Sequence, residues 1–191
     1  MTKKEKDPLH EQIIWTCARG TFAEARNDLL QENIDIHYGG NKFFRVAVTN
    51  EHMELIEFLM CSKELKQKNA LCSLNDPEDS SFVSCIMSAR LESLKKLHEI
   101  HGDFLPGTNA YKQYCTVMSF HEMFGVANLN RDNDLSKKNK DIPYYLIFEI
   151  DVQVTPELQA IINESSVLEK LFLKNTLNKM PTKKTKLRVK I

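Results

Sequence analysis

"NKFFRVAVTNEHMELIEFLM", residues 41–60, places a small residue, Ala47, seven positions before Glu54 and twelve positions before Leu59. The same register recurs along the chain, at intervals of 30, 38, 30 and 35 residues. The small residues that begin the register are Cys17, Ala47, Cys85 and Cys115, and Ile150 fits less closely. A repeat of this length, averaging about 33 residues, indicates an array of small supersecondary units.

Each position of the register has a physical reason. A small residue lets two antiparallel helices approach closely, and a free cysteine serves as a small buried hydrophobe. Glutamate follows seven positions later, at Glu24, Glu54, Glu92, Glu122 and Glu157, where a first-turn carboxylate complements the free N–H groups of a second helix. An apolar residue twelve positions on faces the core, at Leu29, Leu59, Leu97, Ala127 and Ile162. The pattern predicts helix–turn–helix units.

The stretch before Ala47 indicates which kind of helix–turn–helix unit the chain contains. "NIDIHYGGNKFFRVAVTNEHMELIEFL", residues 33–59, resembles the ankyrin repeat, with a turn at Asp35, Gly40 seven residues before Ala47 and a step between helices at 50–52. The resemblance implies that residues around Gly39 and Gly40 form a projecting β-hairpin tip, and glycine supplies positive φ there. "KFFR" at 42–45 and "SSFV" at 80–83 replace the family's Thr-Pro-Leu-His, and Glu51 replaces its usual glycine. The array is therefore a divergent one.

We accordingly expect an all-α fold, a helical solenoid of about five degenerate ankyrin-like units with a C-terminal capping helix. The expected units lie near 8–32, 41–62, 78–100, 108–127 and 143–163, with the capping helix at 165–178. Residues 179–191 carry six bases and no acid, and are expected to form a disordered basic tail.

Short sequence motifs predict where several helices begin and where loops lie. Asp7 with Pro8, and Thr155 with Pro156, are typical of helix starts. The link at 61–77 is long enough for an extra helical turn, and 128–141 is expected to be a loop. Ser166 and Glu169 predict a capping box for the last helix, whose apolar stripe is Val167, Leu168, Leu171 and Leu177.

Composition excludes several protein classes. The 191 residues include 42% hydrophobic and 27% charged residues, and six glycines and six prolines are few for a turn-rich all-β fold. No apolar run approaches the roughly 18 residues of a membrane span. "MTKKEKDP" leads into no apolar stretch, so we expect no secretory signal peptide. Five cysteines without a CxxC pair favour a reducing, cytoplasmic location.

No pattern in the sequence recommends an enzyme or a cofactor site. His98 and His101 share a helix face, but two ligands do not complete a zinc site. The register cysteines are expected to be buried and inert, with Cys61 or Cys72 the faster thiols. Phosphate-loop, dinucleotide and nucleophile-elbow motifs are absent from the sequence.

The expected function is recognition of a protein partner. The resemblance implies contacts from the hairpin tip and the following helix, with candidates His37, Tyr38, Asn41, Arg45 and Thr49. It is also compatible with a microbial protein acting in a host cell. The basic tail supports an alternative, binding of nucleic acid or anionic lipid, and a third alternative is a scaffold within an enzyme assembly.

Overall fold

The computed structural model describes residues 7–119, 142 and 145–179, and these residues are predominantly helical. The helices are α1 (Pro8–Arg19), α2 (Phe22–Leu29), α3 (Tyr38–Thr49), α4 (Met53–Cys61), α5 (Lys63–Gln67), α6 (Ser81–Met87), α7 (Leu91–His101), α8 (Asn109–Ser119), the π-helical turn η2 (Tyr145–Glu149), α10 (Pro156–Asn163) and α11 (Ser166–Lys179). Within the described residues, β pairing is limited to one isolated bridge between Phe104 and Val152. The all-α prediction is confirmed, and no helix in the described part is long and apolar enough to cross a membrane.

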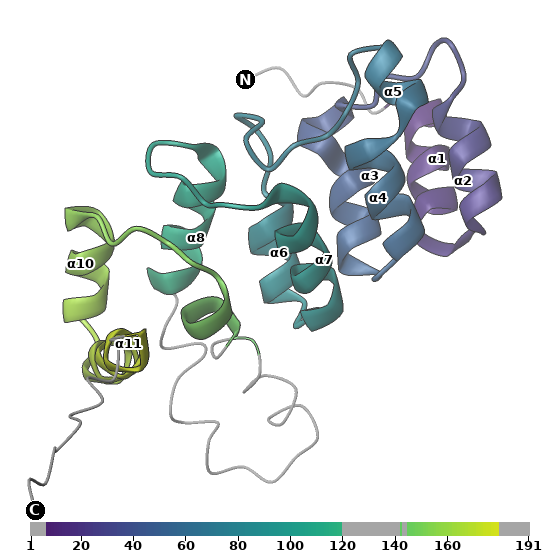
Figure 1. The fold of residues 1–191 in the computed structure, drawn as a ribbon. Coiled ribbons are helices and arrows are strands. Elements are labelled where there is room, and N and C mark those ends of the chain that lie inside the picture. The colour runs from purple at the N-terminus through teal and green to yellow at the C-terminus, as the bar shows by residue number, and fades with distance from the viewer. Residues whose placement is uncertain (1–6, 120–141, 143–144, 180–191) are drawn as a thin grey trace, which may run out of the picture.

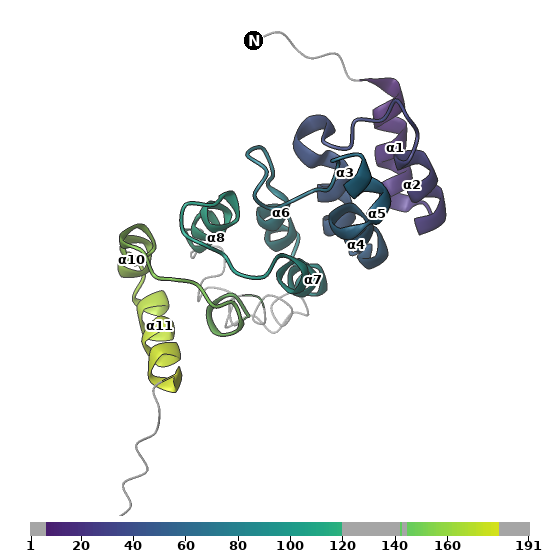
Figure 2. The same cartoon turned by 45° about the horizontal axis from the view of Figure 1, so that its top comes forward.

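The helices form pairs that pack one after another. α1 pairs with α2, α3 with α4 and α6 with α7, and short turns join the partners while longer loops join successive pairs (Figure 1). α1, α3, α6 and α8 pack side by side as a first-helix row, and α2, α4 and α7 pack as a second-helix row (Figure 2). The core lies between the rows, where Phe43, Phe44, Phe82 and Tyr114 have no exposed surface.

The small residues of the register occupy equivalent buried positions in the first-helix row. Ala47 and Cys85 are 0% exposed, Cys17 is 1% exposed and Cys115 is 3% exposed. They lie in α3, α6, α1 and α8 respectively. Their predicted burial is confirmed, and it places a small side chain wherever neighbouring helices pack closely.

The glutamates and apolar residues of the register also lie where the pattern predicts. Glu24, Glu54, Glu92 and Glu157 stand in the first turns of α2, α4, α7 and α10. Leu29, Leu59, Leu97 and Ile162 are buried. Glu122 and Ala127 lie outside the described residues. Glu24 completes a capping box with Thr21, whose hydrogen bonds lower the pKa of the Glu24 carboxyl.

The turns after α3 and α6 share one hydrogen-bond pattern despite lacking glycine. Glu51 and Ala89, each four residues after the small position, have φ of 59° and 53°. The next N–H donates to the carbonyl of the small residue, from His52 to Ala47 and from Arg90 to Cys85. These are Schellman motifs, which satisfy the last carbonyls of a helix. Glu51 thus stands in a conformation that glycine normally supplies.

The C-terminal helices group differently from the predicted units. α10 packs against α8 and pairs with α11, which also packs against η2, and hydrogen bonds join η2 to α7 and α8. His98 Nδ1 lies 3.0 Å from Tyr145 Oη, and Tyr114 Oη donates to the carbonyl of Leu146 at 2.9 Å. The described part of 143–163 is therefore divided: η2 follows α7 in the second-helix row, and α10 extends the first-helix row.

Most predicted helix starts agree with the structure, but the last one does not. Asp7 accepts from the N–H of Leu9, Thr155 accepts from Leu158, and α5 supplies the extra turn expected within 61–77. In α11 the cap is Ser165, whose Oγ accepts from Leu168 N–H, so the predicted cap at Ser166 is wrong.

The predicted apolar stripe of α11 is covered over only part of its length. Leu168 is buried, but Leu177 is 57% exposed because α11 packs against α10 and η2 rather than lying across the stack. The predicted loop at 128–141 and nearly all of the basic tail lie outside the described residues.

Candidate protein-binding surface

Residues 37–41 form a left-handed turn before the regular part of α3. Gly39, Gly40 and Asn41 have φ of 60°, 67° and 61°, which glycine adopts freely and asparagine tolerates. The positive φ predicted for both glycines is confirmed. The Nη1 and Nη2 groups of Arg45 donate to the carbonyl oxygens of Gly40 and Gly39, at 2.6 and 2.9 Å. Arg45 therefore holds the turn against its own helix.

Asn41 connects this turn to the loop that precedes α6. Its Nδ2 donates to Asp76 Oδ2 at 2.8 Å and to Asp79 Oδ2 at 3.2 Å. Its Oδ1 lies 2.7 Å from the Nδ1 of His37. A single amide thus joins two carboxylates and an imidazole across 38 positions of sequence.

The position of Asn41 corrects the expected hairpin tip. The described residues contain no strand here, and the turn packs against the loop at 73–80, where a Cβ on Gly40 would lie 3.0 Å from the backbone oxygen of Glu78. Asn41 is 2% exposed. Because three successive left-handed residues fold the chain back onto this loop, Asn41 is a buried structural residue rather than an exposed contact.

Asp79 is the buried centre of the same network. Ser81 donates to it from both its backbone N–H and its hydroxyl, and Gln113 Nε2 donates at 3.3 Å. Burial raises the pKa of the Asp79 carboxyl, against the opposing effect of these hydrogen bonds and of the one from Asn41. Gln113 lies in α8, so the network joins three successive first helices through one loop.

The other predicted contact residues remain at least partly accessible. His37 is exposed, whereas Tyr38 is half-buried with its ring 4.4 Å from that of His10. Thr49 is half-buried, and its hydroxyl donates to the carbonyl of Val46. Partner binding by these residues and by Arg45 stays a prediction.

The first-helix row carries further exposed side chains in register with Arg45 and Thr49. Those two residues lie two positions before and two positions after Ala47, one helical turn apart on the same side. The equivalent pair is Trp15 and Arg19 in α1, and Val83 and Met87 in α6. Because these helices pack side by side, the three pairs stand at equivalent positions along the row, and we call this strip of six residues the first-helix face.

Two large apolar side chains of the first-helix face are exposed to solvent. Trp15 is 59% exposed and Met87 is 52% exposed. The guanidinium of Arg19 lies over the Trp15 ring, with its carbon 4.6 Å from the ring centroid. The contacts predicted from the sequence did not include Trp15, Arg19 or Met87. These residues occupy, in the other helix pairs, the positions that Arg45 and Thr49 occupy in α3.

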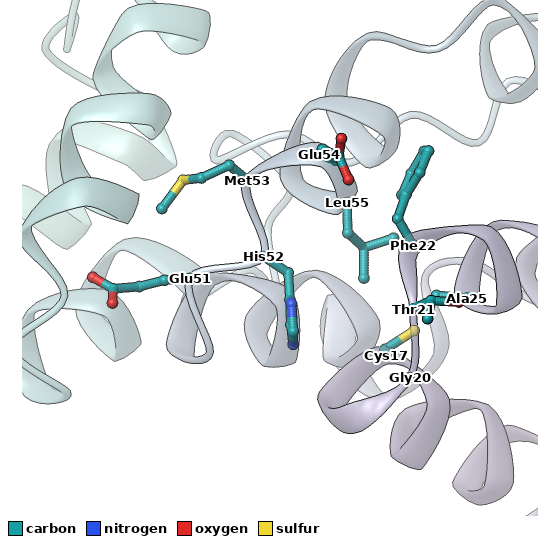
Figure 3. Close-up of a pocket in the computed structure, with 10 residues that line it drawn as sticks. All are labelled: Cys17, Gly20, Thr21, Phe22, Ala25, Glu51, His52, Met53, Glu54 and Leu55. Carbon is teal, nitrogen blue, oxygen red and sulfur yellow. The ribbon is translucent and has the colours of Figure 1, made fainter.

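A hollow of about 280 Å³ lies at the turns that join α1 to α2 and α3 to α4, next to the C-terminal ends of the first helices. Figure 3 shows its lining, in which Glu51 and Met53 extend toward the next helix pair and Cys17 lies on the α1 side. His52 and Cys17 both line it, but burial raises the pKa of the Cys17 thiol to about 12. The thiol is protonated at neutral pH, so this arrangement does not supply an activated nucleophile.

The thiols and histidines singled out in the sequence have structural contacts. Of the two thiols expected to react faster, Cys61 is exposed, whereas Cys72 is 2% exposed and burial raises its pKa. Burial lowers the pKa of His98 and of His101, and both rings pack against Phe104. Among the described residues, no group of three or more His, Cys, Asp or Glu side chains is placed to hold a metal ion.

Comparison with known proteins gives no match to a family model, to a curated protein or to a solved structure.

Proposed function

We propose that this chain is a non-catalytic protein-interaction module, built as an ankyrin-like solenoid, that binds a partner protein through its first-helix face. The row-by-row packing of helix pairs supports a solenoid, because each pair buries its apolar side against its neighbours. The recurrence of small buried residues at Cys17, Ala47 and Cys85 supports an ankyrin-like register. The proposal includes a reducing, cytoplasmic location, which five free cysteines support.

The observation that carries the proposal is the exposure of Trp15 and Met87 on one strip. Tryptophan and methionine are enriched at protein interfaces, and a large exposed aromatic ring gains free energy when a partner removes it from water. Arg45 and Thr49, two of the contact residues predicted from the sequence, stand between them in the row. The strip is therefore a more complete interface than the 37–41 turn alone.

Trp15 and Met87 are better test positions than Arg45. Arg45 holds the left-handed turn, so its replacement alters the fold and any binding together. Trp15 and Met87 are more than half exposed, so a serine at either site should leave the free energy of unfolding within about 0.5 kcal/mol of wild type.

The test is a quantitative affinity capture with four forms of the full chain, at low and at high salt. These are wild type, Trp15→Ser with Met87→Ser, the control Leu173→Ser with Leu177→Ser, and a chain lacking residues 179–191. The control removes two leucines of similar exposure, 59% and 57%, from α11. We expect specific partners to be lost from the first-helix variant alone.

The alternative binding mode gives the reverse pattern. If the basic tail binds nucleic acid or anionic lipid, deletion of residues 179–191 should abolish capture, and a rise in salt from about 50 to 200 mM should weaken it many-fold. Retention of every partner by the Trp15→Ser, Met87→Ser chain would refute the proposal.

A further inference from the structure

The charges of the two helix rows are of opposite character. In the described helices α1, α3, α6 and α8, Glu11 is the one acidic residue, and its carboxylate pairs with Lys42 at 2.8 Å. The bases of this row are Arg19, Lys42, Arg45 and Lys112. The second-helix row instead carries more acids than bases: the acids are Glu24, Asp28, Glu54, Glu57, Glu92 and Glu99, and the bases are Arg26, Lys95 and Lys96. The first-helix row is thus net basic and the second-helix row net acidic, and the first-helix face itself carries two bases, Arg19 and Arg45, and no acid.

Arg19 is the cation of this face that is best placed to receive an anion. Its guanidinium lies over the Trp15 ring and both residues are exposed. A guanidinium stacked on an aromatic face keeps its N–H groups in its own plane, where they can donate to both oxygens of a carboxylate. Arg45, by contrast, already donates to the carbonyl oxygens of Gly39 and Gly40.

Apolar side chains extend from this cation across the row. Val83 and Met87 stand in α6 at the positions that Trp15 and Arg19 occupy in α1, with Thr49 between them in α3. A ligand that spans α1 to α6 therefore meets a cation and an aromatic ring at one end, and a branched aliphatic side chain and a thioether at the other.

We propose that the first-helix face binds an acidic peptide segment that also carries bulky apolar side chains. This rests on the proposed function and names the chemistry of the partner. A carboxylate of the segment accepts from Arg19, and its apolar side chains cover Trp15, Val83 and Met87. Charge complementarity selects an acidic segment over a basic one, because the first-helix face carries two bases, Arg19 and Arg45, and no acid.

The loop edge of the molecule favours a peptide over a nucleic acid. The loops that precede α3, α6 and α8 carry Asp35, Asp76, Glu78 and Asp103. A phosphate backbone has a negative charge at every nucleotide and is repelled by such an edge. A peptide carries carboxylates only at particular positions, so it can place them at Arg19 and keep them away from the loops.

The test begins with a phage-displayed library of random 12-residue peptides, selected on the full chain. Peptides that also bind the Trp15→Ala, Arg19→Glu variant are subtracted. We expect the remaining peptides to be acidic, with two or more Leu, Ile, Phe or Trp residues. An enriched peptide is then labelled with fluorescein, and its dissociation constant is measured by fluorescence polarisation.

Two single variants and two matched controls identify the contacts. Trp15→Ala and Arg19→Glu should each weaken the labelled peptide about tenfold or more, as hot-spot truncations do. Leu173→Ala and Lys174→Glu make equivalent changes on α11, at the other end of the stack, and should change affinity less than twofold. Urea unfolding of each variant shows whether the fold is retained.

The remaining outcomes separate this inference from the proposed function. Enriched peptides that are neutral or basic, but still depend on Trp15, would overturn the acidic partner and leave a protein-binding face. If no peptide is enriched, the acidic-peptide inference fails, and the proposed function is decided by the affinity capture. If binding is indifferent to Trp15 and Arg19, both fail. Tight binding of a 20-nucleotide oligothymidylate, lost in Arg19→Glu and competing with the peptide, would assign the face to nucleic acid instead.

Discussion

Replacement of Asn41 measures how strongly the left-handed turn is held to the loop before α6. Asn41→Gly keeps the backbone conformation, since glycine adopts a φ near 61° without strain, but removes both donors to Asp76 and Asp79. Asn41→Ala removes the same donors and adds the strain of a left-handed alanine. Comparison of the two variants separates hydrogen bonding from backbone conformation.

The expected loss follows from the burial of the two acceptors. Asp79 is 5% exposed, so water cannot replace the lost donor, and a hydrogen bond to a charged group contributes about 1.5–3 kcal/mol. The side chain of Asp76 is 32% exposed, so water can replace the amide there and the loss is small. Asn41→Gly should therefore lower the free energy of unfolding by about 1.5–3 kcal/mol, and Asn41→Ala by roughly 1 kcal/mol more.

Asn41→Asp tests the charges of the site. The aspartate has the shape of the asparagine but places a third carboxylate against Asp76 and Asp79, so its deficit at neutral pH should exceed that of Asn41→Gly. Protonation of the cluster removes the like-charge repulsion, so the deficit relative to wild type should shrink as the pH falls toward about 4.

Urea titrations followed by far-ultraviolet circular dichroism, at pH 7 and at lower pH, measure these differences as shifts of the unfolding midpoint. An Asn41→Gly chain within about 0.5 kcal/mol of wild type would refute the reasoning, because the bond to Asp79 would then contribute nothing. An Asn41→Asp deficit that does not change with pH would show that the two aspartates do not face position 41.

Further predictions concern the core, the thiols and the histidines. Ala47→Leu should lower the free energy of unfolding by roughly 1–3 kcal/mol through overpacking, and an unchanged urea midpoint would mean that the helices do not approach closely there. An aromatic disulfide reagent should react rapidly with one cysteine of the native protein, Cys61, because the other four are buried. Rapid reaction of a second cysteine would contradict the packing. Burial lowers the pKa of His98 and His101, so the unfolded chain binds protons more readily, and stability should be lost as the pH falls through the unfolded value of about 6.5. His98→Gln with His101→Gln should flatten this dependence of the urea midpoint on pH, and an unaltered slope would contradict it.

Features decided within one helix pair were predictable from the sequence. The burial of Cys17, Ala47 and Cys85 follows from periodic spacing, and the cap at Thr155 follows from a local Thr-Pro signal. Such features depend on residues close in the chain, so the pattern of residue types contains the necessary information.

Features decided between distant segments were not predictable in the same way. Ile150 and Glu157 fit the register by residue type, yet α10 pairs with α11, because that choice depends on which surfaces meet. The Gly39-Gly40-Asn41 run indicates a turn in any setting. The burial of Asn41 depends on the long loop at 73–80, to which its side chain donates from 38 positions away.

The candidate surface was predictable in part. Arg45 and Thr49 were selected from the unit that most resembles the ankyrin repeat, while Trp15 and Met87 belong to units with weaker resemblance. Their shared strip emerges only when α1, α3 and α6 are placed side by side. Residue type alone does not distinguish an exposed tryptophan from a core one.

The packing of each helix pair against its neighbours also determines how the chain can assemble during synthesis. Lys42 and Glu11 are 31 positions apart, Asn41 and Asp79 are 38 apart, and Ser93 and Val48 are 45 apart. Contacts of such short span favour rapid folding, because each closes only a modest loop. At about 5–20 residues per second, a further 38 residues leave the ribosome in roughly 2–8 seconds. The first helix pairs can therefore dock in sequence while the remainder of the chain is still being made, and the stack grows from its N-terminal end.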